Sequence, residues 1–192
     1  MNTVDKKILK RKQIAKSCAS ILEKTQYHNV TISKLACEAG IGKGTIYEYF
    51  ENKEDIVFEL MTCMQESYDE KLEQLLNNDN NVIEQINSLF MLFLDNDETT
   101  TKQRDIYKQF LIICLSTTSS KMKEYNSKVR NKYINILNSI IFNKVVATNM
   151  YDSIIAIFIN SNTLVNYNLK ENIQKYIKEQ IIQINKKGNK QC

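Results

Sequence analysis

The chain has 192 residues, no proline and only four glycines, so very little in it can interrupt a helix. Proline removes a backbone donor and clashes with the preceding helical turn, whereas glycine costs conformational entropy. The long segments are instead rich in Leu, Ile, Lys, Glu and Gln, which favour helices. Because 43% of the residues are hydrophobic, the chain can also bury a core, which excludes global disorder. The sequence therefore predicts an all-α fold.

The spacing of apolar residues predicts about nine helices. The first runs from Asp5 to about Lys24, and two short helices follow between Thr31 and Phe50. A long helix begins at Lys53 and ends in the asparagine cluster at residues 77–81. The remaining helices are expected at residues 82–94, 102–117, 121–142, 150–165 and 170–185. We therefore expect a three-helix head, residues 1–52, and a larger helical body, residues 53–192.

The two short helices have the pattern of a helix-turn-helix. Thr31 can cap the first of them, and Gly40 follows it where a left-handed turn would place a glycine. On the second, Ile46 and Phe50 are four residues apart and face inward. The side chains left facing outward include those of Lys43, Gly44, Thr45, Tyr47 and Glu48. Slim residues at the start of such a helix let its backbone approach base edges in a major groove.

Basic residues are concentrated in this head. Up to Lys53 there are ten basic residues and five acidic ones, whereas the remainder of the chain is close to neutral. A basic head on a near-neutral body suggests a polyanionic partner. A solvated charged surface is the alternative, and charge alone does not exclude it.

The stretch VTISKLACEAGIGKGTIYEYFENKEDIVFEL resembles the DNA-binding signature of TetR-type transcriptional regulators. The resemblance covers about residues 8–60, and it fixes residue types at many spacings at once. It implies a homodimeric transcriptional repressor that binds double-stranded DNA and responds to a ligand. The DNA-contacting residues that we expect are Thr31, Lys43, Gly44, Thr45, Tyr47, Tyr49 and Lys53; the resemblance implies backbone contacts for Thr31, Tyr47, Tyr49 and Lys53.

Several of these residues have a purely structural alternative. Thr31 can be only a cap, and Tyr49 can be partly buried against the first helix. Two positions depart from the family pattern, which usually has serine at Gly42 and glycine at Gln26. Without a serine cap, the second short helix is less firmly held by a few tenths of a kcal/mol.

The body contains aromatic and sulfur-containing side chains that could surround an apolar ligand. The candidates are Met61, Met64, Tyr68, Phe90, Tyr107, Phe110, Cys114, Tyr125 and Phe158. Histidine is absent from this region and charges are few among these positions, which favours a lipophilic or aromatic effector. Most of these residues could equally be ordinary core.

The last two helices, at about residues 150–185, are the expected homodimer surface. Their apolar residues exceed what one thin body needs to cover, and pairing with a second copy would give a four-helix interface. The residues concerned are Ile154, Ile155, Phe158, Leu164, Ile173, Ile177, Ile181 and Ile184. A fully intramolecular core is the alternative.

Other classes of protein receive little support from the sequence. The five cysteines are scattered, and His28 is the only histidine, so we expect no metal, no cofactor and no catalytic constellation. The start of the chain lacks a signal-peptide pattern, and no apolar run is long enough to span a membrane, so we expect a cytoplasmic protein. The rival hypothesis is a helical interaction protein whose basic head binds a protein partner or an acidic membrane surface.

Overall fold

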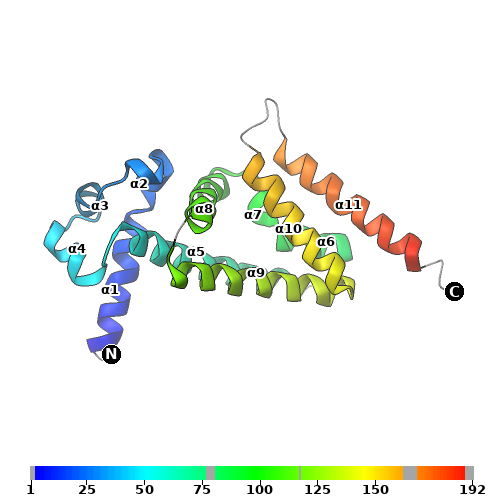
Figure 1. Ribbon diagram of the computed structural model, residues 1–192, viewed down its shortest axis with the longest axis horizontal. Coiled ribbons are helices and arrows are strands. Elements are labelled where there is room, and N and C mark those ends of the chain that lie inside the picture. The colour runs from blue at the N-terminus through cyan, green and yellow to red at the C-terminus, as the bar shows by residue number, and fades with distance from the viewer. Residues whose placement is uncertain (1–2, 77–80, 117, 162–167, 189–192) are drawn as a thin grey trace. The chain divides into compact units, whose positions relative to one another are not determined.

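The computed structural model describes residues 3–76, 81–116, 118–161 and 168–188, and within these ranges it contains helices and no strand (Figure 1). The all-α prediction is confirmed. The elements are α1 (Thr3–Ser17), α2 (Ala19–Lys24), the 3₁₀ helix η1 (Tyr27–Asn29), α3 (Ile32–Glu38), α4 (Lys43–Tyr49), α5 (Lys53–Leu76), α6 (Val82–Leu89), α7 (Met91–Leu94), α8 (Glu98–Ser116), α9 (Ser120–Ile141), α10 (Lys144–Asn160) and α11 (Leu169–Gly188). None of them has both the length and the apolar character that crossing a bilayer requires, within these same ranges.

Two of the predicted helices are each divided in two. The first is interrupted at Cys18, whose N–H is shared between the carbonyls of Ile14 and Ala15, at 3.3 and 3.1 Å. The helix predicted at 82–94 is divided into α6 and α7 at Phe90, where φ is −110° and ψ is 20°. Such shared hydrogen bonds tighten a helical turn, so neither break needs a glycine or a proline.

The boundaries of the later helices also differ from the prediction. The helix expected from Met150 begins at Lys144, because the side chain of Asn143 accepts a hydrogen bond from the N–H of Val146 and caps it. Three parts of the predicted helices lie outside the described residues: 77–80 of the asparagine cluster, residue 117, and 162–165 with Leu164.

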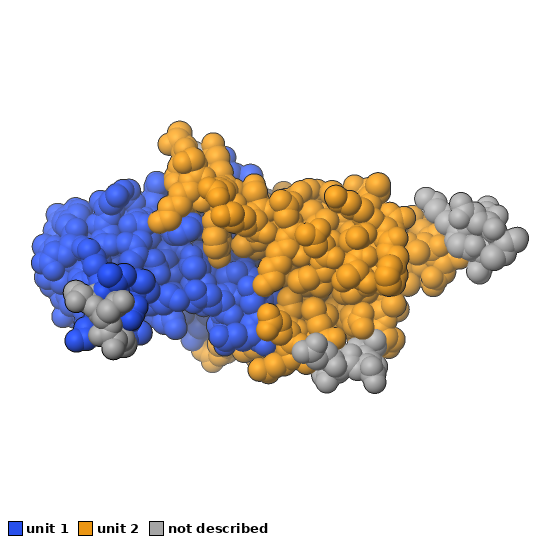
Figure 2. Space-filling view, turned by 90° about the horizontal axis from the view of Figure 1, so that it is seen from below, with its two compact units in different colours: residues 1–70, 102–116 blue, residues 71–101, 117–192 orange. Residues whose placement is uncertain are grey.

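The chain divides into two compact units (Figure 2). The first contains residues 1–70 and 102–116, and the second contains residues 71–101 and 117–192. Helix α5 therefore belongs to the first unit up to Glu70, and most of α8 belongs to that unit too. The functional division at residue 52 remains a prediction.

The first unit buries apolar side chains from each of its α-helices. Its fully buried large side chains include Leu22, Leu35, Ile46, Phe50, Ile56 and Phe110. They come from α2, α3, α4, α5 and α8 and from the residue that ends α4. Burial of such side chains stabilises the fold by about 1.5–3 kcal/mol each. The head helices are thus held by the same core as the start of α5.

The second unit has an aromatic core. Phe93 lies 4.6 Å from Phe158 and 6.2 Å from Phe90 between ring centroids, and Tyr151 lies 6.4 Å from Phe90. These separations are those at which aromatic rings attract one another. At the surface, Arg130 on α9 makes two hydrogen bonds, of 2.9 and 2.6 Å, to the carboxylate of Asp152 on α10. Helix α10 packs against both α9 and α11 (Figure 1).

Candidate nucleic-acid interface

The turn between α3 and α4 is closed by backbone hydrogen bonds. The N–H of Ile41 donates to Ala36 at 3.0 Å, and the N–H of Gly40 donates to Cys37 at 3.1 Å. This pair of bonds is a Schellman motif, which needs a left-handed residue, and Gly40 has φ of +65°. The predicted role of Gly40 is confirmed. The corner therefore fixes the angle between α3 and α4 by local geometry.

Helix α4 has one buried face and one exposed face. Ile46 is 0% exposed and Phe50, which ends the helix, is 2% exposed. The exposed residues on α4 are Lys43, Gly44, Tyr47 and Glu48, and Tyr47 alone retains 52% of its surface. Thr45 and Tyr49 are half-buried. The outward face that the sequence predicted is thus free of the first unit's core.

The first turn of α4 has no side-chain cap. Gly42 occupies the N-cap position and makes no capping hydrogen bond. An added Cβ at Gly44 would meet no atom within 4 Å. The start of α4 therefore offers uncapped backbone N–H groups beside an exposed lysine, Lys43, which is an arrangement that attracts phosphate.

Arg11 on α1 fixes the end of α4 against α5. Its guanidinium donates to Glu59 at 2.6 Å and to Asp55 at 2.7 Å, and it also donates to the carbonyl of Tyr49. The same group lies 4.3 Å from the ring centroid of Phe50. Burial alone would lower the pKa of Arg11, but hydrogen bonds and charge from the two carboxylates outweigh burial and raise the pKa. Sequence reasoning missed this residue because its partners are 38 to 48 positions away.

Thr31 and Lys53 have structural roles as well as predicted DNA contacts. The hydroxyl of Thr31 accepts from the N–H of Lys34 at 3.3 Å, so Thr31 caps α3 and remains exposed. The ammonium of Lys53 donates to the carbonyls of Tyr27 and Val30, both at 3.2 Å, and lies 4.4 Å from the ring centroid of Tyr27. Lys53 thus holds the segment that leads into α3, and its predicted phosphate contact stays a prediction.

Residues 19–60, which include this whole corner, match the family model described as bacterial regulatory proteins of the tetR family. Over this segment the chain is similar to TetR-family regulators. The segment runs from α2 to the first two turns of α5, so it contains every predicted DNA-contacting residue of the TetR-type head.

Similarity to curated TetR-type relatives is confined to the amino-terminal part. Over 62 residues the chain is 37% identical to the fatty acid metabolism regulator protein of Bacillus subtilis (strain 168), which is 32% of each chain. The match thus spans about a third of the length of that relative. What the whole protein binds or regulates is not carried over by so short a match.

Solved structures of transcriptional regulators resemble the fold of this chain over most of its length. A transcriptional regulator from Rhodococcus sp. Rha1 has a TM-score of 0.72 at 15% identity, with 91% of this chain and 95% of that chain covered. A Saccharomonospora viridis protein solved in complex with choline has a TM-score of 0.72 at 16% identity, with 89% and 94% covered. At these identities the likeness concerns the fold alone.

The nine candidate ligand residues fall into both compact units. Met61, Met64, Tyr68, Tyr107, Phe110 and Cys114 belong to the first unit, and Phe90, Tyr125 and Phe158 belong to the second. Three of them are almost fully buried, namely Met61, Phe110 and Phe158. The rings of Phe90 and Phe158 also contact the ring of Phe93, which is part of the core of the second unit. Burial raises the pKa of Cys114 to about 11, so it is a neutral thiol. These observations favour the core interpretation for the most buried residues.

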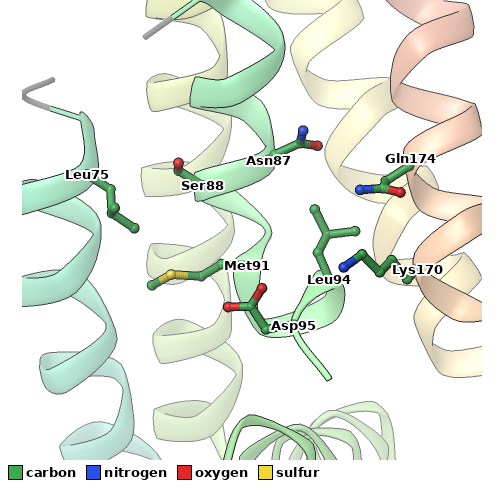
Figure 3. A pocket seen from close by; sticks show the side chains of 8 residues that line it. All are labelled: Leu75, Asn87, Ser88, Met91, Leu94, Asp95, Lys170 and Gln174. Carbon is green, nitrogen blue, oxygen red and sulfur yellow. The ribbon is translucent and has the colours of Figure 1, made fainter. Parts of the chain in front are cut away.

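A hollow of about 280 Å³ lies in the second unit (Figure 3). It is lined by Leu75, Asn87, Ser88, Met91, Leu94, Asp95, Lys170 and Gln174, none of which was a candidate in the sequence. The side chain of Leu75 lies at one side of the hollow, and the side chains of Lys170 and Gln174 line it from α11. Five of the eight lining residues are polar or charged, so the hollow suits a small polar molecule. Within the described ranges, no group of three or more potential metal ligands is present.

Proposed function

We propose that this chain is a transcriptional repressor that binds double-stranded DNA as a homodimer and is released by a small effector. The observation that carries the proposal is the exposed face of α4, with Lys43, Gly44 and Tyr47, on a head whose corner is closed and whose core is buried. A short helix presented in this way fits a major groove. Similarity of the head to TetR-type regulators supports the same function.

Each predicted contact has a role in this proposal. Lys43 reaches a guanine edge or a phosphate, while Gly44 and Thr45 let the backbone approach the bases. The hydroxyls of Tyr47 and Tyr49 donate to phosphate oxygens, as does Thr31 from the start of α3. In a dimer, two such heads read half-sites of a near-palindromic operator roughly 34–36 Å apart.

The proposed dimer surface is formed by α10 and α11. Four of its expected residues, Ile154, Phe158, Ile173 and Ile177, are buried within the second unit and therefore serve its own core. Ile155, Ile181 and Ile184 are only half-buried, and Ile182 is 52% exposed. This remaining apolar surface supports a contact between copies, although it is narrower than the sequence predicted.

The DNA proposal is tested by binding to the chain's own upstream DNA at several salt concentrations. Lys43→Gln should weaken binding and lower the slope of log K against log salt by about 1.8, because each of the two heads of the dimer loses one phosphate contact. Lys123→Gln, which removes an exposed lysine from α9, is the matched control and should leave both quantities unchanged. Tyr47→Ala should also weaken binding. No retardation at low salt, or retardation indifferent to both head variants, would contradict the proposal.

For the effector we propose an apolar or aromatic molecule. The Bacillus subtilis relative is named for the metabolism of fatty acids, and the chain has abundant aromatic side chains in both units. The polar hollow of Figure 3 points to the opposite class, for which the choline bound to the Saccharomonospora viridis protein is an example. The two classes can be separated by experiment.

Thermal unfolding with decanoate or with choline makes this separation. A ligand that binds only the folded protein, present at 100 times its Kd, stabilises it by about 2.7 kcal/mol. We expect decanoate to raise the Tm and to release DNA in the retardation assay, and choline to do neither. Stabilisation by choline alone, abolished in Asp95→Asn, would contradict an apolar effector and locate binding in the hollow.

A further inference from the structure

One side chain of α8 makes hydrogen bonds to the backbone at the end of α2 and at the start of η1. The amide of Gln109 accepts from the N–H of Tyr27 at 2.8 Å and donates to the carbonyl of Leu22 at 2.7 Å. Gln109 is half-buried, and its two partners are 82 and 87 positions away in the sequence. All three residues belong to the first compact unit.

The two backbone groups are ones that their own helices leave unsatisfied. Leu22 lies in the last turn of α2, where carbonyls have no intrahelical donor, and Tyr27 is the first residue of η1. Gln26, at the N-cap of η1, makes no side-chain capping bond. A primary amide accepts through its oxygen and donates through its nitrogen at once, so Gln109 caps both helix ends together.

The same segment is held from its other side by α5. The ammonium of Lys53 donates to the carbonyls of Tyr27 and Val30, as described above. Val30 immediately precedes Thr31, which caps α3. The backbone from Leu22 to Thr31 is therefore tied to both α8 and α5, and α3 and its corner with α4 follow directly in the chain.

We infer that Gln109 is a positioning residue, which fixes the helix-turn-helix to α8 so that the two move as one body. The inference rests on the proposed DNA-binding function. Because half-site spacing is a rigid geometric requirement, a head that is firmly held should discriminate strongly between operator spacings. A head released from α8 should lose preorganisation, which weakens binding at the correct spacing and tolerates incorrect ones.

The test measures affinity for operators of different spacing. The full chain is titrated against its own operator and against versions with one or two base pairs inserted between the half-sites. Gln109→Leu removes both hydrogen bonds at nearly constant volume, and Gln109→Asn keeps the amide but is too short to reach both groups. Gln103→Leu, on the same helix, is the matched control, since the side chain of Gln103 makes no hydrogen bond within the described residues.

For both Gln109 variants we expect about a tenfold loss of affinity at the native spacing, as two hydrogen bonds are lost. The penalty for an inserted base pair should shrink by about threefold or more relative to the wild type. Amide hydrogen exchange at Tyr27 should also accelerate. Gln103→Leu should behave as the wild type in all three measurements.

The outcomes separate the inference from the function on which it rests. Equal loss of affinity at every spacing would show that Gln109 only stabilises the fold and would overturn the inference, as would unchanged exchange at Tyr27. If the wild type retards no DNA, the proposed function fails and the inference fails with it. If the wild type prefers one operator spacing and both Gln109 variants keep that preference, the inference is refuted and the proposed function is not.

Discussion

Replacing Arg11 by methionine should destabilise the protein far more than an ordinary ion pair would suggest. The substitution removes the guanidinium from the carboxylates of Asp55 and Glu59, whose side chains are only 17% and 14% exposed. Breaking a fully buried pair costs about 3–5 kcal/mol. Because Arg11 itself is 21% exposed, solvent screening reduces this cost, and we expect a loss of about 2–3 kcal/mol.

The measurement is urea unfolding of the full chain followed by far-UV circular dichroism. Arg130→Met is the matched control, because Arg130 also makes two hydrogen bonds to a carboxylate but is 37% exposed with a partner that is 50% exposed. We expect that control to lose less than about 1 kcal/mol. If the two variants lose the same stability, burial of the Arg11 cluster does not govern its contribution, and the reasoning is wrong.

Two other perturbations follow from the backbone and from the thiols. Gly40→Ala forces a side chain into a left-handed conformation and should lower the free energy of unfolding by about 1–2 kcal/mol, whereas Gly44→Ala, on α4, should raise it by about 0.5–1 kcal/mol. A Gly40→Ala variant that melts at the wild-type temperature or above it would contradict the assigned turn. In iodoacetamide labelling at pH 8, Cys37 should react first among the four cysteines of the described residues, because it is the exposed one of the four. Burial raises the pKa values of Cys18 and Cys114 to about 11, so these thiols stay protonated at that pH and should be modified only after unfolding. Peptide mapping that finds Cys18 modified as fast as Cys37 would refute this order.

The head could be predicted from the sequence because its signals are local. The stripe of Ile46 and Phe50 is visible within five residues, and Gly40 stands directly at the turn that needs it. Thr31 likewise precedes the helix that it caps. Each of these features depends on neighbours in the chain, so one sequence contains the whole argument.

The contacts that hold the head in place could not be predicted in the same way. Arg11 and Gln109 act on residues 38 to 87 positions away, and in the sequence each is an ordinary polar residue of a helix. The break at Cys18 has no local signal either. One missed boundary did have a signal, since Asn143 before Lys144 is a recognisable cap. The aromatic residues of the body were ambiguous because core and ligand pockets use the same residue types.

The Schellman corner between α3 and α4 has a kinetic consequence. Its hydrogen bonds form between backbone groups of the protein itself, so the angle between α3 and α4 is set before the protein meets DNA. Encounter with DNA then requires no folding of the corner, and the rate of association should be set by diffusion and long-range attraction between the lysines and the phosphates. Only the uncapped first turn of α4 would become more ordered on binding, because hydrogen bonds to the nucleic acid would replace those to water there.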